Sequence, residues 1–568
     1  MFFRIKPSGP RSYPRIVENR WEGGRTRQRV LATLGRHDHL QQSGQLDALL
    51  ASGARLAQSV LLLSAHAKGQ IPTITTRRIG PALVFERLWR QTGCKGAIER
   101  LRGGRRFGFD LERAIFLTVL HRLCAPGSDR AADKWEADYQ IEGRDALQLH
   151  HRYRAMAWLG EESPHDQQED ETPFAPRCIK DRVEEEVFAS RRDLFTDLQR
   201  VFFDTTSIYC GGNGGEDIGR RGYSKDHRPD LYQMVVGAVL DGQGRPICCA
   251  LWPGNTTDVT ALLPVVDRLR SRFGIRRVCV VADRGMISRE TIEALEQPGR
   301  GWQYILGARM RSQAEVNEDV LSRAGRYRVV HPPRVKSDDP SPLKVKEVRV
   351  EDRRYVVCLN AEEARQDAAD RAAIVAALRE RLRRGDKALV GNEGYRRYLG
   401  ATGPEHFRID EAKVAEDARY DGKWVLRTNT ELDAAEVALQ YQRLWVVEQW
   451  FRSSKSLLQT RPIFHRCDEA IRGHVFCSFP ALVLRREPQA RSEERGHEFE
   501  WADVIGDLDR LQAVEVEQEG KRFLLRSEAQ GTCGPVFHAV GVALPPTVQH
   551  VPPASQGRDA APGATPQD

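Results

Sequence analysis

The stretch between residues 199 and 310 restricts the fold most, because its apolar runs follow one another in the order of a mixed α/β sheet. Short apolar runs bounded by turn residues are typical of buried strands, and longer runs with apolar spacings of three and four are typical of helices. Strands are predicted over 199–210, 232–241 and 246–254, followed by a helix over 260–273, a strand over 276–286, a helix over 288–297 and a strand over 302–309. The sequence therefore predicts an α/β fold with a mixed sheet.

Three acids stand out against this pattern. The apolar run QRVFFDTTSIYC is expected to end at Asp204, and RRVCVVADRGM at Asp283. Open α/β sheets place their sites at the carboxyl ends of strands, although a turn or cap role is the alternative for each aspartate. Glu448 lies within an apolar helix, WVVEQWFRSSK (445–455), where a buried acid needs a partner such as Arg, Lys or a cation. Carboxylates suit Mg²⁺ or Mn²⁺, and two such ions support phosphodiester chemistry.

Composition narrows the class of protein. The 568 residues include 87 Lys+Arg and 79 Asp+Glu, a formal charge of +8, which fits a nucleic-acid partner without requiring one. The eleven cysteines contain no CxxC pair, so neither a zinc site nor a disulfide framework is indicated. The chain has no Walker loop, no apolar signal core and no run long enough to span a bilayer. We therefore expect a cytosolic protein without a nucleotide cofactor.

The remaining segments suggest several regions. YPRIVENRW and RTRQRVLATLG predict a basic hairpin around Gly23 and Gly24, for which DNA contact and an ordinary solvated hairpin are both open. Helices are expected over 45–67, 80–160 and 179–200, with a loop over 161–172. We predict a basic N-terminal region (1–75), a helical region (76–198) and a first core segment (199–310). These are followed by an inserted subdomain (311–430), a second core segment (431–486), a C-terminal region (487–550) and a disordered tail (551–568).

The inserted subdomain is predicted where the α/β rhythm stops. LKVKEVRVEDRRYVVCLN (343–360) alternates like a solvated hairpin, 364–385 is a charged helix, and 420–430 is a turn and a strand. One long helix is then expected from about 432 to 459, and another near 468–486.

Six ordered motifs carry a family resemblance: DTTS (204–207), GYSKDHRPDLYQMVVGAVLD (222–241), PGNTTD (253–258), VVADRGM (280–286), YQRLWVVEQWFRSSK (441–455) and RPIFHR (461–466). Together they resemble the DDE transposases of bacterial insertion sequences, in the subgroup with a tyrosine–arginine–glutamate–lysine signature. The resemblance covers roughly residues 100–485 and, more weakly, the N-terminal hairpin. It implies an RNase H-like catalytic core with a β-rich insertion, joined here to a mainly helical N-terminal region.

The resemblance also implies an activity and its partners. Asp204, Asp283 and Glu448 match the three catalytic, metal-binding acids, which would hold two Mg²⁺ or Mn²⁺ ions. The implied reaction is cleavage at the ends of the element and strand transfer into target DNA. The implied partner is double-stranded DNA, both terminal inverted repeats and target, bound by a homodimer at the nucleoid of the cytoplasm.

The signature helix departs from the family at one position. Tyr441, Glu448 and Lys455 are seven residues apart, which would place them on one face of a continuous helix, with Tyr441 and Lys455 toward DNA phosphates. The signature arginine would fall at position 444, which is Leu444 here. Arg452 is a candidate to compensate as a DNA contact.

Several other residues have two interpretations. Trp445, Trp450 and Phe451 are expected in the core rather than stacking on bases. Asp258 is expected to be a helix cap, and His465 and His474 to be structural. SKDHRPD (224–230) is either a loop on the substrate side or a charged surface turn. Two rival functions stay open: a catalytically decayed DNA-binding relative, and a host nuclease on the same fold.

Overall fold

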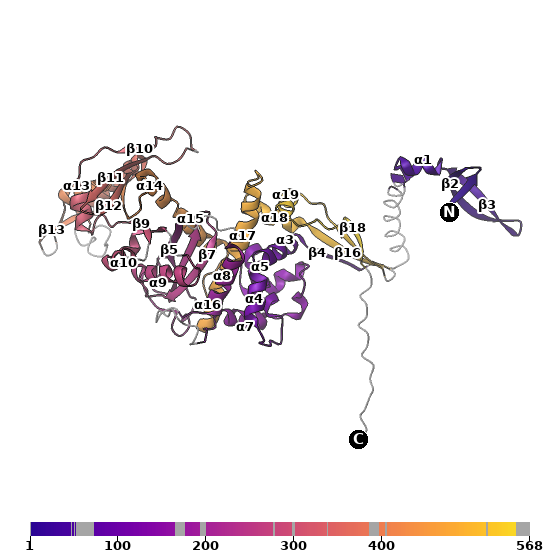
Figure 1. Cartoon of the computed structure of the whole chain (residues 1–568), viewed down its shortest axis with the longest axis horizontal. Helices are drawn as coiled ribbons and strands as arrows, with labels where there is room; N and C mark the ends of the chain where they lie inside the picture. The colour runs from indigo at the N-terminus through magenta and orange to yellow at the C-terminus, as the bar shows by residue number, and fades with distance from the viewer. Residues whose placement is uncertain are drawn as a thin grey trace, which may run out of the picture. The chain divides into compact units, whose positions relative to one another are not determined.

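In the computed structural model of the chain (Figure 1), the described residues are 2–46, 48–49, 52, 73–164, 176–192, 200–275, 279–297, 302–337, 339–384, 397–403, 406–518 and 521–551. The chain divides into two units. One comprises Met1–Arg77, Gln512–Glu528 and Pro545–Asp568, and the other comprises Arg78–Leu511 and Ala529–Leu544. The predicted helix over 45–67, the loop over 161–172 and the tail over 551–568 lie largely outside the described residues.

The first unit contains two sheets. The predicted N-terminal hairpin is confirmed as β2 (Arg11–Glu22) and β3 (Arg25–Thr33), and β1 (Phe2–Ser8) pairs with β2. Gly23 and Gly24 form the turn with φ of 61° and 79°, a conformation that favours glycine. A short helix, α1 (His37–Gln42), follows β3. The second sheet has the order β18-β17-β16-β4, with the strands Val548–Val551, Lys521–Arg526, Gln512–Gln518 and Thr73–Arg78.

The second unit begins with helices, as predicted. These are α3 (Gly80–Gln91), α4 (Cys94–Arg102), α5 (Leu111–Cys124), α6 (Asp129–Trp135), α7 (Leu149–Gly160) and α8 (Ile179–Ser190). Helix α5 is buried along nearly its whole length, and α7 packs closely on the later helix α16 (Asp468–Phe476). A Cβ atom on Gly160 would lie 2.0 Å from the Glu469 carbonyl oxygen, so this approach of the two helices requires glycine.

The central sheet has the predicted strands in RNase H-like order. The strands β5 to β9 span Arg200–Tyr209, Gln233–Asp241, Pro246–Pro253, Cys279–Ala282 and Gln303–Gly307. Their order is β7-β6-β5-β8-β9, in which β6 is antiparallel to its neighbours while β5, β8 and β9 are parallel. Helices α9 (Asp258–Ser271) and α10 (Arg289–Leu295) pack beside this sheet (Figure 1). The expected α/β class and RNase H-like core are confirmed.

The expectation that the first strand ends at Asp204 is wrong. Strand β5 continues to Tyr209, because β6 pairs with it along its full length, up to the pair Tyr209↔Gln233. Thr205 and Thr206 are β-branched, and both are buried within the strand. Asp204 therefore lies in the middle of β5.

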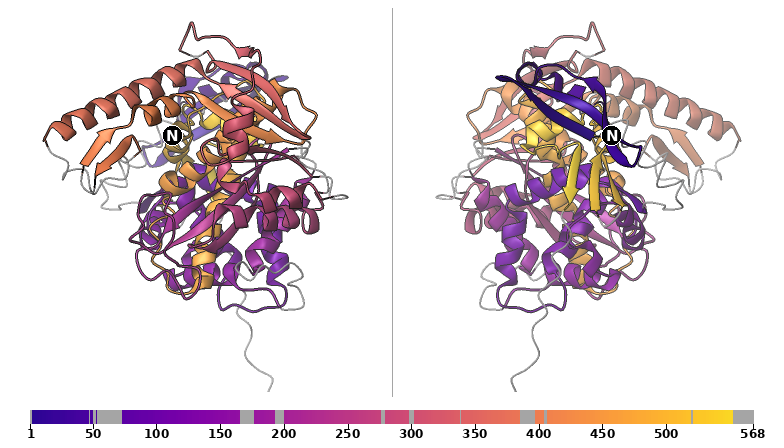
Figure 2. Two further views of the ribbon diagram at one scale, coloured as in Figure 1. Left: turned by 90° about the vertical axis from the view of Figure 1, so that its left-hand side faces the viewer. Right: turned by 90° about the vertical axis from the view of Figure 1, so that its right-hand side faces the viewer.

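The strands of the insertion extend the same sheet. Beyond β9 the order continues β15-β12-β11-β10, with the strands Lys423–Thr428, Arg353–Leu359, Leu343–Val350 and Arg328–His331. A hairpin does form over 343–360, but the expectation that it is solvated is wrong. Its second strand, β12, lies between β11 and β15 in the sheet, and Val356, Val357 and Cys358 of β12 are completely buried. The charged helix is confirmed as α11 (Ala361–Arg384), and Figure 2 shows it beside the hairpin of β13 (Leu399–Gly403) and β14 (His406–Ile409). Helix α13 (Glu411–Ala418) precedes β15.

The single helix expected over 432–459 is wrong. The chain forms α14 (Ala434–Gln442), α15 (Trp445–Arg452) and a π-helical turn, η8 (Ser453–Leu457). The break falls at Arg443 and Leu444, where amides bond to carbonyls three residues back. Leu444 is buried there, and the Arg443 Nη2 atom donates 2.7 Å to the Gly242 carbonyl oxygen.

The C-terminal part of this unit is helical. After α16 come α17 (Ser478–Glu493), α18 (Trp501–Arg510) and α19 (Cys533–Val540), and α17 packs on α5 and α19. Within the part of the chain that the structure describes, no helix is both long and apolar enough to span a membrane.

Candidate active site

Asp204 lies in β5, and Asp283 comes directly after β8, the parallel strand that pairs with β5. In the register of β5 and β8, Phe203 pairs with Ala282, so Asp204 in β5 and Asp283 directly after β8 each follow one member of this last pair. Asp283 follows the end of β8, as predicted, and the 3₁₀ turn η5 (Arg284–Met286) begins directly after it. Both side chains are partly buried. The sheet register, rather than a strand end at Asp204, brings these two carboxylates together.

The surroundings of Asp204 shift the pKa of its carboxyl group. Burial, with smaller contributions from the neighbouring Asp283 and Asp258, raises the pKa of Asp204 to about 6. The Lys225 ammonium, 3.9 Å from Asp204 Oδ1, and the Thr205 amide, which donates 2.7 Å to the same oxygen, act in the opposite direction. Neighbouring carboxylate oxygens of this kind are a donor set that a divalent cation would stabilise.

Tyr441 belongs to this carboxylate group. Its hydroxyl donates a hydrogen bond of 2.8 Å to Asp283 Oδ1, and burial together with Asp283 raises the pKa of Tyr441 well above its usual range. A Cβ atom on Gly307 in β9 would come within 2.5 Å of this hydroxyl. Glycine at position 307 therefore leaves the space that the tyrosine needs.

Glu448 lies on the exposed side of α15. Val447, Trp450 and Phe451 face inward at the spacing of an amphipathic helix, whereas Glu448 is exposed and Trp445 is 56% exposed. Placement of Trp450 and Phe451 in the core is confirmed, and that of Trp445 is wrong. Among the described residues, Asp204, Asp283 and Glu448 do not bring three ligand oxygens within 4.8 Å of one another.

The predicted DNA contacts have different surroundings. Arg452 is exposed on α15. Lys455, in η8, is mostly buried, and its Nζ atom lies 2.8 Å from Asp226 Oδ1. Burial lowers the pKa of Lys455, with Asp226 acting against this effect. Because of the break at 443–444 and the π-helical turn, the three signature residues do not lie along one regular helix.

The SKDHRPD loop lies against the central strand. The Lys225 amide donates 2.8 Å to Ser207 Oγ, and its ammonium donates to the Thr205 carbonyl oxygen at 2.8 Å and to Thr205 Oγ1 at 2.9 Å. The same loop carries Asp226, the ion-pair partner of Lys455. It therefore contacts both Thr205, the neighbour of Asp204, and Lys455.

Asp258 is a site residue that the sequence analysis misassigned. The cap position of α9 is Thr257, and no side chain caps this helix end, so the expected cap role of Asp258 is wrong. Its Oδ1 atom instead accepts a hydrogen bond from Thr205 Oγ1, and its Oδ2 atom lies 3.1 Å from Lys225 Nζ. A Cβ atom on Gly285 would come within 2.9 Å of Oδ2. The PGNTTD motif, quoted for the resemblance, contained the signal.

His465 and His474 form a structural network. His474 Nδ1 accepts from Arg122 Nη2 at 2.8 Å and faces His465 Nε2 at 3.1 Å, while His474 Nε2 lies 3.1 Å from the Thr460 carbonyl oxygen. These histidines and Asp129 have ligand atoms within 4.8 Å of one another. The Arg122 guanidinium already supplies the positive charge there, and burial lowers the pKa of His474 well below its usual value. The structural role fits this arrangement better than a metal site.

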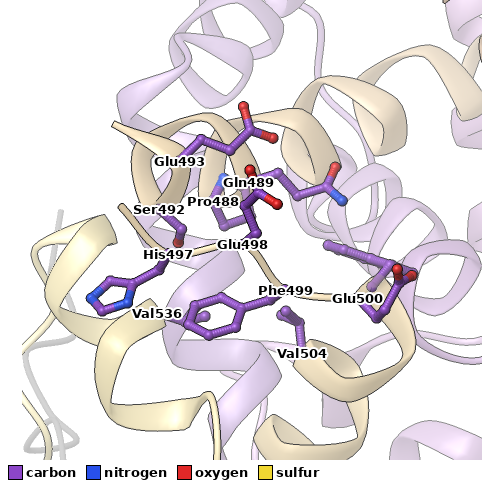
Figure 3. A pocket seen from close by; sticks show the side chains of 11 residues that line it. Pro488, Gln489, Ser492, Glu493, His497, Glu498, Phe499, Glu500, Val504 and Val536 are labelled. Carbon is purple, nitrogen blue, oxygen red and sulfur yellow. The ribbon is translucent and has the colours of Figure 1, made fainter. Parts of the chain in front are cut away.

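Two hollows lie away from the aspartates. A groove of about 710 Å³ has an aromatic and basic lining that includes Trp445, Arg443, Arg485 and Arg486. A second pocket of about 400 Å³, shown in Figure 3, lies between α17 and α18, and His497, Glu498 and Glu500 contribute to its wall.

Comparison with known proteins identifies the family. Residues 196–484 match the transposase DDE domain, and residues 3–65 match the N-terminal domain of IS1634 family transposases. No curated protein matches the chain. A solved structure described as a piggyBac transposase synaptic complex with hairpin DNA is 9% identical, covering 76% of this chain and 79% of that one with a TM-score of 0.37, which is too distant to bear on the site. DDE transposases act on DNA with divalent metal ions, and the oxygen donors of Asp204 and Asp283 suit such ions. The chain belongs to the DDE transposases of bacterial insertion sequences.

Proposed function

We propose that Asp204, Asp283 and Glu448 are the catalytic carboxylates of this transposase and that they hold two Mg²⁺ ions, with Mn²⁺ as a substitute. The observation that carries the proposal is that Asp204 in β5 and Asp283 directly after β8 each follow the pair Phe203↔Ala282, within the matched transposase domain. Glu448 is the proposed third ligand, supported by its exposure on the helix that follows the Tyr441 helix. When bound, the ions would activate the attacking oxygen and stabilise the leaving oxygen.

The protein's own residues prepare this site. Tyr441 holds one oxygen of Asp283 through its hydroxyl proton, so we assign Tyr441 to orienting this ligand in place of the expected DNA contact. Lys225 lies beside Asp204 and Asp258 and offsets part of the repulsion among the acids. The buried register of β5 and β8 fixes the spacing of the two aspartate backbones.

The proposed DNA contacts are basic residues that follow Glu448 in the sequence. We propose that Lys455 and Arg452 contact DNA phosphates, Lys455 as a point charge and Arg452 from the exposed side of α15. The proposed substrates are the terminal inverted repeats of the element and the target DNA, with a homodimer pairing the two ends. Because the substrate is DNA, we expect the protein to act at the nucleoid.

An end-cleavage assay tests the proposal. A duplex carrying the element's terminal repeats should be cut at the repeat end in Mg²⁺ and joined to a target duplex. Absence of nicking by the wild-type protein, with end binding intact, would support the decayed DNA-binding relative. Cleavage that yields no joined product would support the host nuclease.

A further inference from the structure

The buried carboxylate of Asp226 pairs with two cationic side chains, Lys455 and Arg461. Asp226 Oδ1 lies 2.8 Å from Lys455 Nζ, and Asp226 Oδ2 forms an ion pair with Arg461 Nη1. The side chains of Asp226 and Lys455 are only 9% and 11% exposed, and that of Arg461 is 27% exposed. Each oxygen of this carboxylate thus has its own cationic partner.

The cations are held in place by other parts of the fold. The Arg461 guanidinium lies over the Tyr209 ring, 5.5 Å from its centre, at the end of β5. Lys455 is fixed in the π-helical turn that follows the Glu448 helix. The two cations therefore come from separate segments of the chain, and both contact Asp226 near Tyr209 at the end of β5.

Lys225, the neighbour of Asp226 in sequence, contacts the residues around Asp204. Lys225 bonds to Thr205 and pairs with Asp258, while Asp226 pairs with Lys455 and Arg461. The loop therefore presents a cation to the acids and an anion to the cations. A lysine and an arginine converging on two oxygens form the donor set that recognises a phosphodiester as well as a carboxylate.

We propose that Lys455 and Arg461 form one phosphodiester-binding site, and that the Asp226 carboxylate occupies the phosphate position in the DNA-free protein. DNA binding then exchanges Asp226 for a backbone phosphate. The identification of that phosphate as DNA rests on the proposed function. The inference adds Arg461 as a phosphate contact and Asp226 as a competitor, neither of which the sequence resemblance assigns.

The first test uses inorganic phosphate and does not depend on transposition. Thermal unfolding is followed against phosphate concentration for the wild type, D226N and D230N, at constant ionic strength with chloride. D230N is the matched control, because Asp230 lies on the same loop but pairs with the exposed Arg228. Phosphate should raise the Tm of D226N more than that of the other two proteins. R461Q added to D226N should remove this extra shift. Equal shifts in all three proteins would overturn the proposal.

The second test uses a duplex carrying the terminal repeat. D226N should bind it about 3- to 10-fold more tightly than the wild type, because no internal carboxylate has to be displaced. The slope of log K against log salt should stay the same, because both proteins contact the same phosphate. R461Q with Asp226 intact should weaken binding and flatten that slope by up to about one unit, because a phosphate contact is lost. This variant provides a readout if D226N does not fold. Unchanged or weaker binding by folded D226N would overturn the exchange. Failure of the wild type to bind the ends would overturn the proposed function instead, leaving the phosphate result to stand.

Discussion

The hydroxyl of Tyr441 donates a 2.8 Å hydrogen bond to Asp283 Oδ1, so a residue of the signature helix holds a proposed metal ligand of the sheet. Oriented ligands bind metals more tightly than free ones, and loss of such a partner typically costs 10- to 100-fold. The tyrosine therefore connects α14 to the end of β8.

Y441F tests this relationship. The substitution removes the donor but keeps the ring in its buried position beside Gly307. Single-turnover end cleavage in Mg²⁺ should fall by about 10- to 100-fold, and affinity for the duplex should stay within about twofold. Y441F that cuts normally but binds DNA weakly would return Tyr441 to the DNA contacts.

The raised pKa of Asp204 predicts a pH-dependent penalty on stability. A folded-state pKa of about 6 lies above that of the unfolded chain, so the folded protein holds this proton more tightly. The penalty is absent at low pH, grows as pH rises from about 4 to about 6, and is complete above that range. In EDTA at pH 7.5, D204N should have a free energy of unfolding higher by about 1–3 kcal/mol.

The control for D204N is D230N. Its ion pair with Arg228 lowers the pKa of Asp230, so removal of that charge should not stabilise the protein at pH 7.5. Chemical denaturation at pH 4 and pH 7.5 measures both variants. A gain for D204N that is as large at pH 4 as at pH 7.5 would refute the electrostatic origin of the effect.

The contact between Lys225 and Asp258 predicts coupling between two residues far apart in sequence. Their charged atoms are 3.1 Å apart, and both side chains are about a quarter to a third exposed. A double-mutant cycle of K225M and D258N in EDTA should give a coupling energy of about 1 kcal/mol, because partial exposure weakens the pair. Additive effects of the two substitutions would show that the pair does not couple in solution.

The two tryptophans of α15 should behave differently. Trp450 is 9% exposed, whereas Trp445 is 56% exposed on the same helix. W450A should lower the free energy of unfolding by about 3–5 kcal/mol, and W445A by less than about 1 kcal/mol. Thermal unfolding of both variants measures this difference, and equal losses would contradict the orientation of the helix.

Much of the sheet is predictable from the sequence, because its strands are short apolar runs separated by clear turns. The same local patterns do not reveal pairing partners. The β5 strand passes through Asp204 because β6 pairs with it. The 343–360 hairpin lies inside the large sheet because β15 pairs with its second strand, β12. Long-range pairing of this kind is not visible in composition or alternation.

The residues of the candidate site can be proposed from the sequence, but their geometry cannot be derived from it. The ordered motifs name Asp204, Asp283 and Glu448, and the sheet register places the first two side by side. A seven-residue spacing describes one helical face only if the helix is continuous, and the break at Leu444 removes that condition. Asp258 was missed because an acid at the start of a helix is usually explained by the helix itself.

Glu448 is proposed to complete the metal-binding carboxylates of this DNA transposase. Its most direct test is single-turnover cleavage of a terminal-repeat duplex in Mg²⁺ by the wild type, E448Q and Q449A, the last altering the adjacent exposed residue on the same helix. E448Q should bind the duplex with wild-type affinity and cut it slower by roughly two to three orders of magnitude, while Q449A cuts normally. Cleavage by E448Q at the wild-type rate would contradict the account.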